Sequence, residues 1–260
     1  MIGRSGPPLP LHSPTSKPQL IAADWPAPQR VQAFAATRHG GTSRGPHDSL
    51  NFSYGVGDEP DLVTRNRRAL ADTLGVEREV EWLEQVHGAR VYRMGRETKP
   101  ETADAAWSDR AGELCVVTTA DCLPVVLCND GGTEIAAAHA GWRGLAAGVL
   151  EAAIAAFATP APNLLAWMGP AIGAKVYEVG DEVRAAFVDG DAGAAQCFVP
   201  SPAGRWLADL YALARRRLGA AGVERVYGGE FCTYTEEDRF FSYRRAKVSG
   251  RMASGILMRG

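Results

Sequence analysis

The sequence predicts a mixed fold of α-helices and β-strands in one domain, either α/β or α+β. Short apolar and β-branched runs alternate with longer segments of helical periodicity, and no internal repeat or low-complexity linker divides the chain. A chain of 260 residues can also bury a large core without disulfide or metal staples. We expect a proline-rich tail over residues 1–20 and a single domain over residues 21–260.

Helix and strand signals follow one another along this domain. Residues 61–74 have helical spacing, and Gly75 is placed to end that helix. Residues 114–119 and 124–127 predict buried strands, interrupted at Asp121 and Cys122 and followed by a turn over residues 129–132. The other expected elements are a strand at 134–139, an alanine-rich helix at 145–157, helices at 181–187 and 207–218, and strands at 164–168, 225–228 and 240–244.

Composition excludes several classes of protein. With 46% hydrophobic and 22% charged residues, the chain is neither disordered, collagen-like nor a coiled coil. The net charge of -2 gives no basic field for nucleic acid or an anionic membrane. The longest apolar stretch, residues 145–158, is too short to span a bilayer and contains Glu151. An odd count of 5 scattered cysteines indicates reduced thiols and a cytoplasmic protein.

Three side chains that can ligate a metal stand where extended segments break. His87 follows Val86, Cys122 follows Asp121, and His139 ends an apolar run. Strand ends can hold such groups rigidly at a cleft. Two imidazoles and a thiolate suit a tetrahedral zinc with a fourth position open, which is the pattern of a catalytic zinc.

The spacing of these residues leaves other interpretations open. Cys122 can be a small buried hydrophobe, with both histidines simply hydrogen-bonded. Cys122 can instead be a nucleophile with His139 as its base. A copper site with the same ligands is a further alternative, although it needs a weak axial ligand such as methionine, and only Met94 and Met168 stand near these motifs in sequence.

Two segments suggest a local anion site. Residues 37–45 form a glycine- and hydroxyl-rich loop with Arg38 and Arg44, without the order of a P-loop. Near the C-terminus, aromatic residues precede Arg244 and Arg245, and a strand there would place these two arginines on opposite faces. Surface turns and edge strands with solvated arginines would have the same sequence features.

An ordered set of motifs resembles one family. The motifs are Thr37-Arg38-His39-Gly40-Gly41-Thr42-Ser43, Ser49-Leu50-Asn51-Phe52, Asn66-Arg67-Arg68, Gln85-Val86-His87-Gly88, Ala103-Asp104-Ala105, Thr119-Ala120-Asp121-Cys122-Leu123-Pro124, His139-Ala140-Gly141-Trp142-Arg143-Gly144, Gly169-Pro170-Ala171-Ile172-Gly173, Tyr177-Glu178-Val179 and Ser242-Tyr243-Arg244-Arg245. Together they resemble the YfiH-type purine nucleoside phosphorylases, a family also called laccase-domain, polyphenol oxidase or peptidoglycan editing factor. The resemblance covers about residues 30–258.

The resemblance implies a fold, a metal and an activity. It implies a single catalytic α+β domain with mixed β-sheets in α/β/β/α layers, and zinc on His87, Cys122 and His139. It further implies phosphorolysis of adenosine, inosine and 5′-methylthioadenosine to ribose 1-phosphate, or its methylthio analogue, and free base. Adenosine deamination is implied as a second activity. The partners would be a purine nucleoside and phosphate, with no prediction of oligomeric state.

For the activity that the resemblance implies, the sequence offers candidate catalytic and substrate-binding residues. We expect Asp121 and Arg143 to be catalytic, Asp121 as the carboxylate that moves a proton, with a turn-stabilising role as its alternative. Arg38 and Arg244 are expected to contact phosphate or ribose, with Asn51 and Gln85 as polar partners.

The other family names imply different chemistry. A peptidoglycan-precursor role would suit a cysteine hydrolase with Cys122 as nucleophile. A multicopper oxidase needs more histidines than the 5 of this chain, although a single copper can replace zinc in one site. We therefore expect zinc, with copper as a possible substitute.

Overall fold

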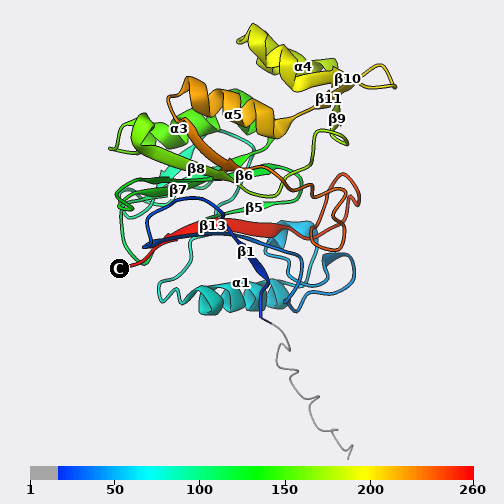
Figure 1. Cartoon of the computed structure of the whole chain (residues 1–260). Coiled ribbons are helices and arrows are strands. Elements are labelled where there is room, and N and C mark those ends of the chain that lie inside the picture. Colours follow the sequence, from blue (N-terminus) through cyan, green and yellow to red (C-terminus); the bar gives the residue numbers. More distant parts are fainter. Residues whose placement is uncertain (1–16) are drawn as a thin grey trace, which may run out of the picture.

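The computed structural model describes residues 17–260 and confirms the mixed α/β class (Figure 1). Most of the predicted tail lies outside the described residues, whereas Leu20 already begins strand β1 (Leu20–Ala22). The strand predicted at residues 114–119 is β5 (Leu114–Thr119), and helix α1 (Pro60–Leu74) ends at Gly75, as expected. Within residues 17–260 no helix combines the length and apolarity that a membrane span requires.

Two stacked sheets form the centre of the molecule. The first is antiparallel and runs β1-β2-β13-β5, with β2 at Val31–Ala36 and β13 at Met252–Met258. The second is mixed and runs β12-β8-β6-β7-β4-β3. Its strands are β3 (Val91–Arg93), β4 (Ala105–Ser108), β6 (Leu123–Asn129), β7 (Ile135–Ala140), β8 (Leu164–Met168) and β12 (Arg225–Gly228).

Helices cover the outer face of each sheet. In Figure 1, α3 (Val149–Ala156) and α5 (Leu210–Ala220) lie over the six-stranded sheet, and α1 lies beneath the four-stranded sheet. This arrangement confirms the expected α/β/β/α layers. A small sheet, β10-β11-β9, stands with α4 (Asp181–Val188) at the top of the view. The remaining elements are β9 (Glu178–Val179), β10 (Phe198–Pro200), β11 (Trp206–Ala208), α2 (Trp142–Ala147) and the 3₁₀ helices η1 (Gly45–His47), η2 (Tyr54–Val56), η3 (Ala161–Asn163) and η4 (Ala192–Cys197).

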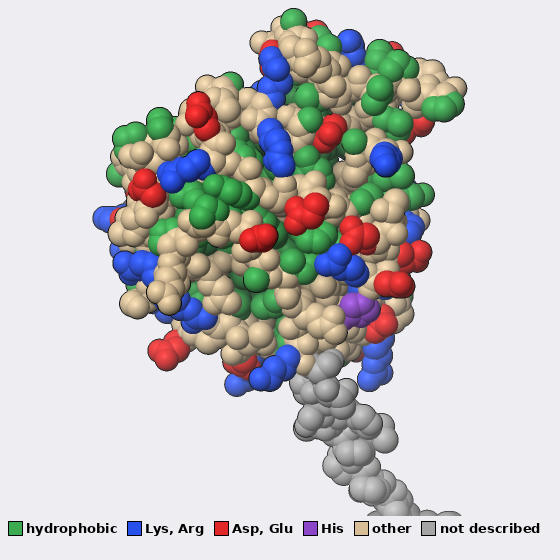
Figure 2. Space-filling view, viewed as in Figure 1, with side chains coloured by type: hydrophobic (Ala, Val, Ile, Leu, Met, Phe, Trp, Pro, Cys, Tyr) green, Lys and Arg blue, Asp and Glu red, His purple; other side chains and the backbone are tan. Residues whose placement is uncertain are grey.

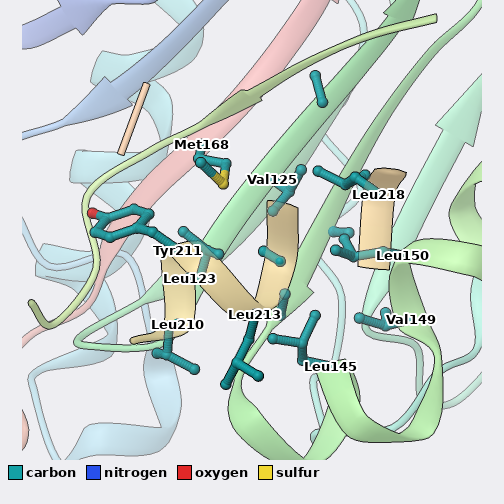
Figure 3. Packing of buried hydrophobic residues seen from close by; sticks show 14 of the residues in the cluster. Leu123, Val125, Leu145, Val149, Leu150, Met168, Leu210, Tyr211, Leu213 and Leu218 are labelled. Atoms are coloured by element: carbon teal, nitrogen blue, oxygen red, sulfur yellow. The ribbon is translucent and has the colours of Figure 1, made fainter. Parts of the chain in front are cut away.

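Strand β6 is apolar from Leu123 to Cys128 and ends at Asn129, and its burial explains the apolar run. All of its residues are buried, because Leu123, Val125 and Leu127 pack toward the helical layer while Val126 and Cys128 face the other sheet. A strand covered on both faces needs apolar side chains at every position. Figure 3 shows Leu123 and Val125 packed with side chains of α2, α3 and α5.

Three of the predicted elements need correction. Residues 145–157 form parts of two helices, α2 and α3, because Gly148 takes a left-handed conformation with φ 93° between them. Helix α5 begins at Leu210, where the Asp209 side chain accepts from the Ala212 N–H at 2.9 Å, and β11 occupies residues 206–208.

The strand predicted at residues 240–244 was wrong, because this segment forms turns. Phe240 and Phe241 are both buried, but neither residue belongs to a strand. The Phe240 N–H donates to the Glu236 carbonyl and the Ala246 N–H to the Ser242 carbonyl, which are turn contacts. Arg244 and Arg245 are therefore not placed by the alternation of a strand.

The surface carries charges of both signs. Figure 2 shows Lys and Arg interspersed with Asp and Glu on the face that it presents. This distribution agrees with the small net charge of -2. Recognition of an anion must depend on local groups.

Gly148→Ala should destabilise the protein by about 1–2 kcal/mol, because a Cβ disfavours the left-handed conformation between α2 and α3. Gly219→Ala, in the last turn of α5 with open space around its Cα, is the control and should stabilise by up to about 1 kcal/mol. Urea denaturation of both variants measures the difference. Equal stability of the two variants would contradict the role given to Gly148.

Candidate metal centre and cavity

The structure brings His87, Cys122 and His139 together from three segments. His87 lies in the loop before β3, Cys122 between β5 and β6, and His139 in β7. Because Leu123 pairs with Ala140 and Pro124 with His139, the β6–β7 register places Cys122 beside His139. One ligand atom from each residue lies within 4.8 Å of the others, and Cys122 Sγ is 3.8 Å from His87 Nε2.

These distances suit a tetrahedral metal. With metal–sulfur bonds of about 2.3 Å and metal–nitrogen bonds of about 2.0–2.1 Å, ligand atoms of a tetrahedron lie about 3.4–3.6 Å apart. Small adjustments of the side chains would close the set around one ion. Among residues 17–260, this is the single group of at least three such ligands. Metal binding itself remains a prediction.

A buried carboxylate, Asp104, organises two of the three ligands. Its Oδ1 accepts from His139 Nδ1 at 2.8 Å and from the His87 N–H at 2.8 Å. Its Oδ2 accepts from the N–H groups of Gly88 and Val86 at 2.7 and 3.2 Å. The bond from Nδ1 leaves His139 Nε2 to face the other ligands, which is the usual arrangement of a carboxylate behind a metal-bound histidine.

Backbone strain is concentrated at this centre. Among the described residues, His87 and Asp121 are the two non-glycine residues with positive φ, at 61° and 88°. Such conformations persist where surrounding contacts enforce them, and they cluster at functional sites. For His87 the enforcing contacts are the three N–H bonds from residues 86–88 to Asp104.

Gly141 provides the space in which the ligands meet. A Cβ at this position would lie 2.7 Å from Cys122 Sγ and 3.0 Å from His87 Cδ2. Both distances are far below ordinary van der Waals contact. The glycine in His139-Ala140-Gly141 is therefore required by the approach of two ligand side chains.

The two imidazoles favour the thiolate form of Cys122. Burial opposes ionisation, but interactions with His139 and His87 outweigh it and lower the pKa of Cys122 to about 6. Burial likewise opposes the charged form of His139, yet Cys122 and Asp104 raise the pKa of His139 to about 9. A thiolate is the form in which cysteine binds a metal or acts as a nucleophile.

Asp121 points its carboxylate away from the metal ligands. Oδ1 accepts from the Thr233 hydroxyl at 2.6 Å, and Oδ2 accepts from the Ser242 hydroxyl at 3.1 Å and the Arg244 N–H at 2.6 Å. The carboxylate therefore joins the β5–β6 loop to residues 233 and 242–244. This geometry favours the turn-stabilising alternative for Asp121 over proton transfer.

A cavity of about 530 Å³ opens over the three ligands. Of the predicted site residues, Gln85 and Arg143 line it together with His87, Cys122 and His139. Gln85 is fixed by Thr118, whose N–H donates to Oε1 at 2.8 Å and whose carbonyl accepts from Nε2 at 2.9 Å. The exposed Arg143 guanidinium lies 4.4 Å from the Trp142 ring.

Arg38, Asn51 and Arg244 are not among the lining residues. Arg38 donates to the carbonyls of Asp48 and Glu237, and Arg244 donates to the Glu178 carbonyl at 2.8 Å. Asn51 is buried, and its Oδ1 accepts from the Arg251 N–H at 2.9 Å. The contacts of these three residues hold loops around the site.

Sequence reasoning missed several lining residues. Arg67 and Thr119 each stand in a motif quoted above but received no role, and no pattern singled out Arg251. All three line the cavity, as do Tyr54 and Tyr243. They come from α1, β5, η2 and the segment between β12 and β13, so only the folded arrangement reveals that they share one cavity.

Comparisons with known proteins find relatives that match most of the chain. The model of a family described as multi-copper polyphenol oxidoreductase laccase matches residues 32–259. The purine nucleoside phosphorylase YfiH of Escherichia coli K12 is 52% identical over 239 residues, covering 92% of this chain and 98% of that protein. The purine nucleoside phosphorylase PA4543 of Pseudomonas aeruginosa is 52% identical over 235 residues, covering 90% and 96%.

A solved structure has the same fold. Protein NMB0706 of Neisseria meningitidis superposes with a TM-score of 0.88 at 47% identity, covering 93% of this chain and 99% of that chain. YfiH of Bacillus licheniformis superposes with a TM-score of 0.82 at 27% identity, covering 88% and 93%.

Gly141→Ala should weaken metal binding by at least about 10-fold, because the new methyl group displaces Cys122 and His87 from each other. Competition with a chromogenic chelator measures the affinity for Zn²⁺. Gly190→Ala, which meets no atom within 4 Å, is the matched control and should bind like the parent. Unchanged affinity in Gly141→Ala would refute the packing argument.

Asp104→Asn should lower Zn²⁺ affinity by about 10–100-fold, because an amide cannot accept all four of the bonds that Asp104 accepts. The same chelator competition measures it, with circular dichroism to verify the fold. Asp109→Asn, on a carboxylate paired with Arg96 outside the cavity, is the control. An affinity equal to that of Asp109→Asn would remove Asp104 from the centre.

Proposed function

The chain belongs to the multi-copper polyphenol oxidoreductase laccase family, and within it we propose that this protein is a purine nucleoside phosphorylase with zinc on His87, Cys122 and His139. The observation that carries the proposal is one cavity in which these three ligands meet arginine side chains. The names of the relatives at about half identity support it.

The proposed substrates are phosphate and adenosine, inosine or 5′-methylthioadenosine. An oxygen of hydrogen phosphate forms a bond to C1′ of the ribose while the bond from C1′ to N9 of the purine breaks. The electron pair of the broken bond leaves with the purine, which takes up the proton of the hydrogen phosphate. The products are ribose 1-phosphate, or its methylthio analogue, and the free base.

The cavity supports this reaction through position and charge. Arg143 is free to stabilise negative charge on phosphate or on the departing purine, since it has no ion pair among the described residues. Gln85, fixed on both sides by Thr118, offers a rigid amide to the ribose or base. Bound zinc would supply Lewis-acid polarisation of a substrate oxygen or amino group.

Residues outside the cavity serve as supports in this proposal. Asp121 holds the backbone of Arg244, and Asn51 holds the backbone of Arg251. Arg38, stacked 4.7 Å from the Phe241 ring, secures the same group of loops. These contacts keep the cavity wall in place during turnover.

Adenosine deamination is part of the proposal as a second activity, because zinc chemistry suits attack on C6 of adenine. Copper is the proposed substitute metal, since copper binds nitrogen and sulfur ligands tightly. A multicopper mechanism is disfavoured, because the described residues hold one candidate metal group. His39 and His47 lie elsewhere and hydrogen-bond to the carbonyls of Asp238 and Val56.

A cytoplasmic location follows from the thiols in this proposal. None of the five cysteines, all within the described residues, forms a disulfide. A reducing compartment preserves the thiolate that Cys122 contributes to the metal centre.

Incubation of the purified, zinc-loaded protein with adenosine should yield adenine and ribose 1-phosphate only when phosphate is present. Chromatography of the products, with and without phosphate, measures the reaction. Inosine formed in either condition reports deamination separately. Adenosine left unchanged in both conditions would refute the phosphorylase and deaminase assignments for this substrate.

Cys122→Ala in the same assay separates zinc chemistry from a cysteine hydrolase. It should lose bound zinc and at least about 100-fold of the turnover, whereas Cys232→Ala should retain both. Mass spectrometry after alkylation should find Cys122 protected in the zinc-loaded protein and modified after chelation. A freely alkylated Cys122 with full zinc content would favour the nucleophile.

A further inference from the structure

The cavity over the metal centre concentrates positive charge. Arg67, Arg143 and Arg251 line it, and within residues 17–260 Glu84 is the one carboxylate among the lining residues. None of the three arginines forms an ion pair with a described residue. Arg67 and Arg251 are half-buried, so their charges lose part of their hydration without gaining a counter-charge, and an anionic ligand would supply one.

Arg67 is held rigidly with its outer nitrogens free. Its guanidinium lies between the rings of Tyr54 and Trp82, 4.3 and 4.2 Å from their centroids. Nε donates to the Phe52 carbonyl at 2.9 Å, and no described residue accepts from Nη1 or Nη2. Burial lowers the pKa of Arg67 to about 10, which reflects the cost of a charge without a partner. Two parallel N–H donors in this position match two oxygens of a phosphate.

Arg251 is joined to Arg67 through Phe52. The Phe52 N–H donates to the Arg251 carbonyl at 3.1 Å, while the Phe52 carbonyl accepts from Arg67 Nε. The Arg251 Nη1 donates to the carbonyls of Ser249 and Gly250, which leaves Nη2 without an acceptor among the described residues. Burial also lowers the pKa of Arg251. The backbone of a single residue, Phe52, thus contacts both arginines.

Thr119 adds an independent observation. It lines the same cavity, is 2% exposed, and its hydroxyl is a buried polar atom without a hydrogen-bond partner. An unsatisfied buried hydroxyl is costly, and a ligand oxygen in the cavity would satisfy it. The hydroxyl can donate, as both guanidinium groups do, so together the three groups favour a ligand with several acceptor oxygens.

We propose that Arg67, Arg251 and Thr119 form the subsite that binds inorganic phosphate. The subsite rests on the proposed function, because phosphate is the co-substrate of a phosphorylase. Two positive charges balance the phosphate dianion, and the shared cavity puts that anion beside the metal centre. The arginines predicted from the sequence, Arg38 and Arg244, instead donate to backbone carbonyls outside the cavity lining.

Isothermal titration of the zinc-loaded protein with inorganic phosphate tests the subsite without any nucleoside. Arg67→Gln and Arg251→Gln should each raise the dissociation constant for phosphate by about 10–100-fold. In the phosphorolysis assay, the KM for phosphate should rise by a similar factor while the KM for the nucleoside changes by less than about 3-fold. Arg67→Lys, which keeps the charge, should recover part of the phosphate affinity.

Arg68→Gln is the matched control, because Arg68 is the exposed neighbour on α1 and does not line the cavity. Its phosphate affinity should equal that of the parent protein. Circular dichroism and thermal melting verify that each variant is folded. Unchanged phosphate affinity in Arg67→Gln, an equal loss in Arg68→Gln, or no phosphate binding by the parent would overturn the subsite.

Thr119→Val gives a second test that does not alter charge. Loss of the hydroxyl should weaken phosphate binding by about 3–10-fold while leaving the phosphate-free protein equally or more stable. Undiminished phosphate affinity would remove Thr119 from the subsite. If the parent binds phosphate in the predicted manner but forms no ribose 1-phosphate, the proposed function fails and the subsite stands.

Discussion

The site depends on the buried carboxylate of Asp104. It ties His139 of β7 to the backbone of residues 86–88, and so sets both imidazoles relative to Cys122. Burial opposes its charge, but bonds from His139 and the N–H groups outweigh that cost and lower the pKa of Asp104. Three of the four hydrogen bonds to this carboxylate fix the backbone of residues 86–88, which explains how His87 is kept at a φ of 61°.

Asp121, the residue before Cys122, also accepts several hydrogen bonds. Its carboxylate collects donors from Thr233, Ser242 and Arg244, segments more than a hundred residues away in sequence. Cys122 therefore lies in a loop that Asp121 anchors. It lies close to the two histidines that Asp104 positions. Metal ligands supported by such outer contacts keep their geometry without needing the ion to impose it.

The residue pattern predicted the mixed α/β class, and the family resemblance implied the layers. Both pointed to His87, Cys122 and His139, which the structure brings together as candidate ligands. Buried strands such as β5 and β8 are short apolar runs bounded by turn residues, so local pattern identifies them. The segment at residues 240–244 has the composition of a strand, but its backbone bonds to the distant Asp121 carboxylate and to the Glu236 carbonyl of the preceding turn. The proximity of Arg67 and Arg251 could not be predicted for the same reason, since Phe52 brings them together only in the folded chain.

Charge is divided within the site in a way that net composition cannot reveal. Asp104 and Asp121 lie behind the metal ligands with their oxygens occupied by donors, whereas Arg67, Arg143 and Arg251 line the cavity. The carboxylates thus hold the structure of the site together, and the arginines line the cavity that would receive the ligand.

With a net charge of -2, long-range steering of an anion is weak. In the proposed phosphate subsite, selectivity would come from donors fixed in place, because a flexible arginine loses part of its interaction free energy to side-chain ordering. The stacking of Arg67 between Tyr54 and Trp82 lowers that ordering cost, because it restricts the side chain before any anion binds.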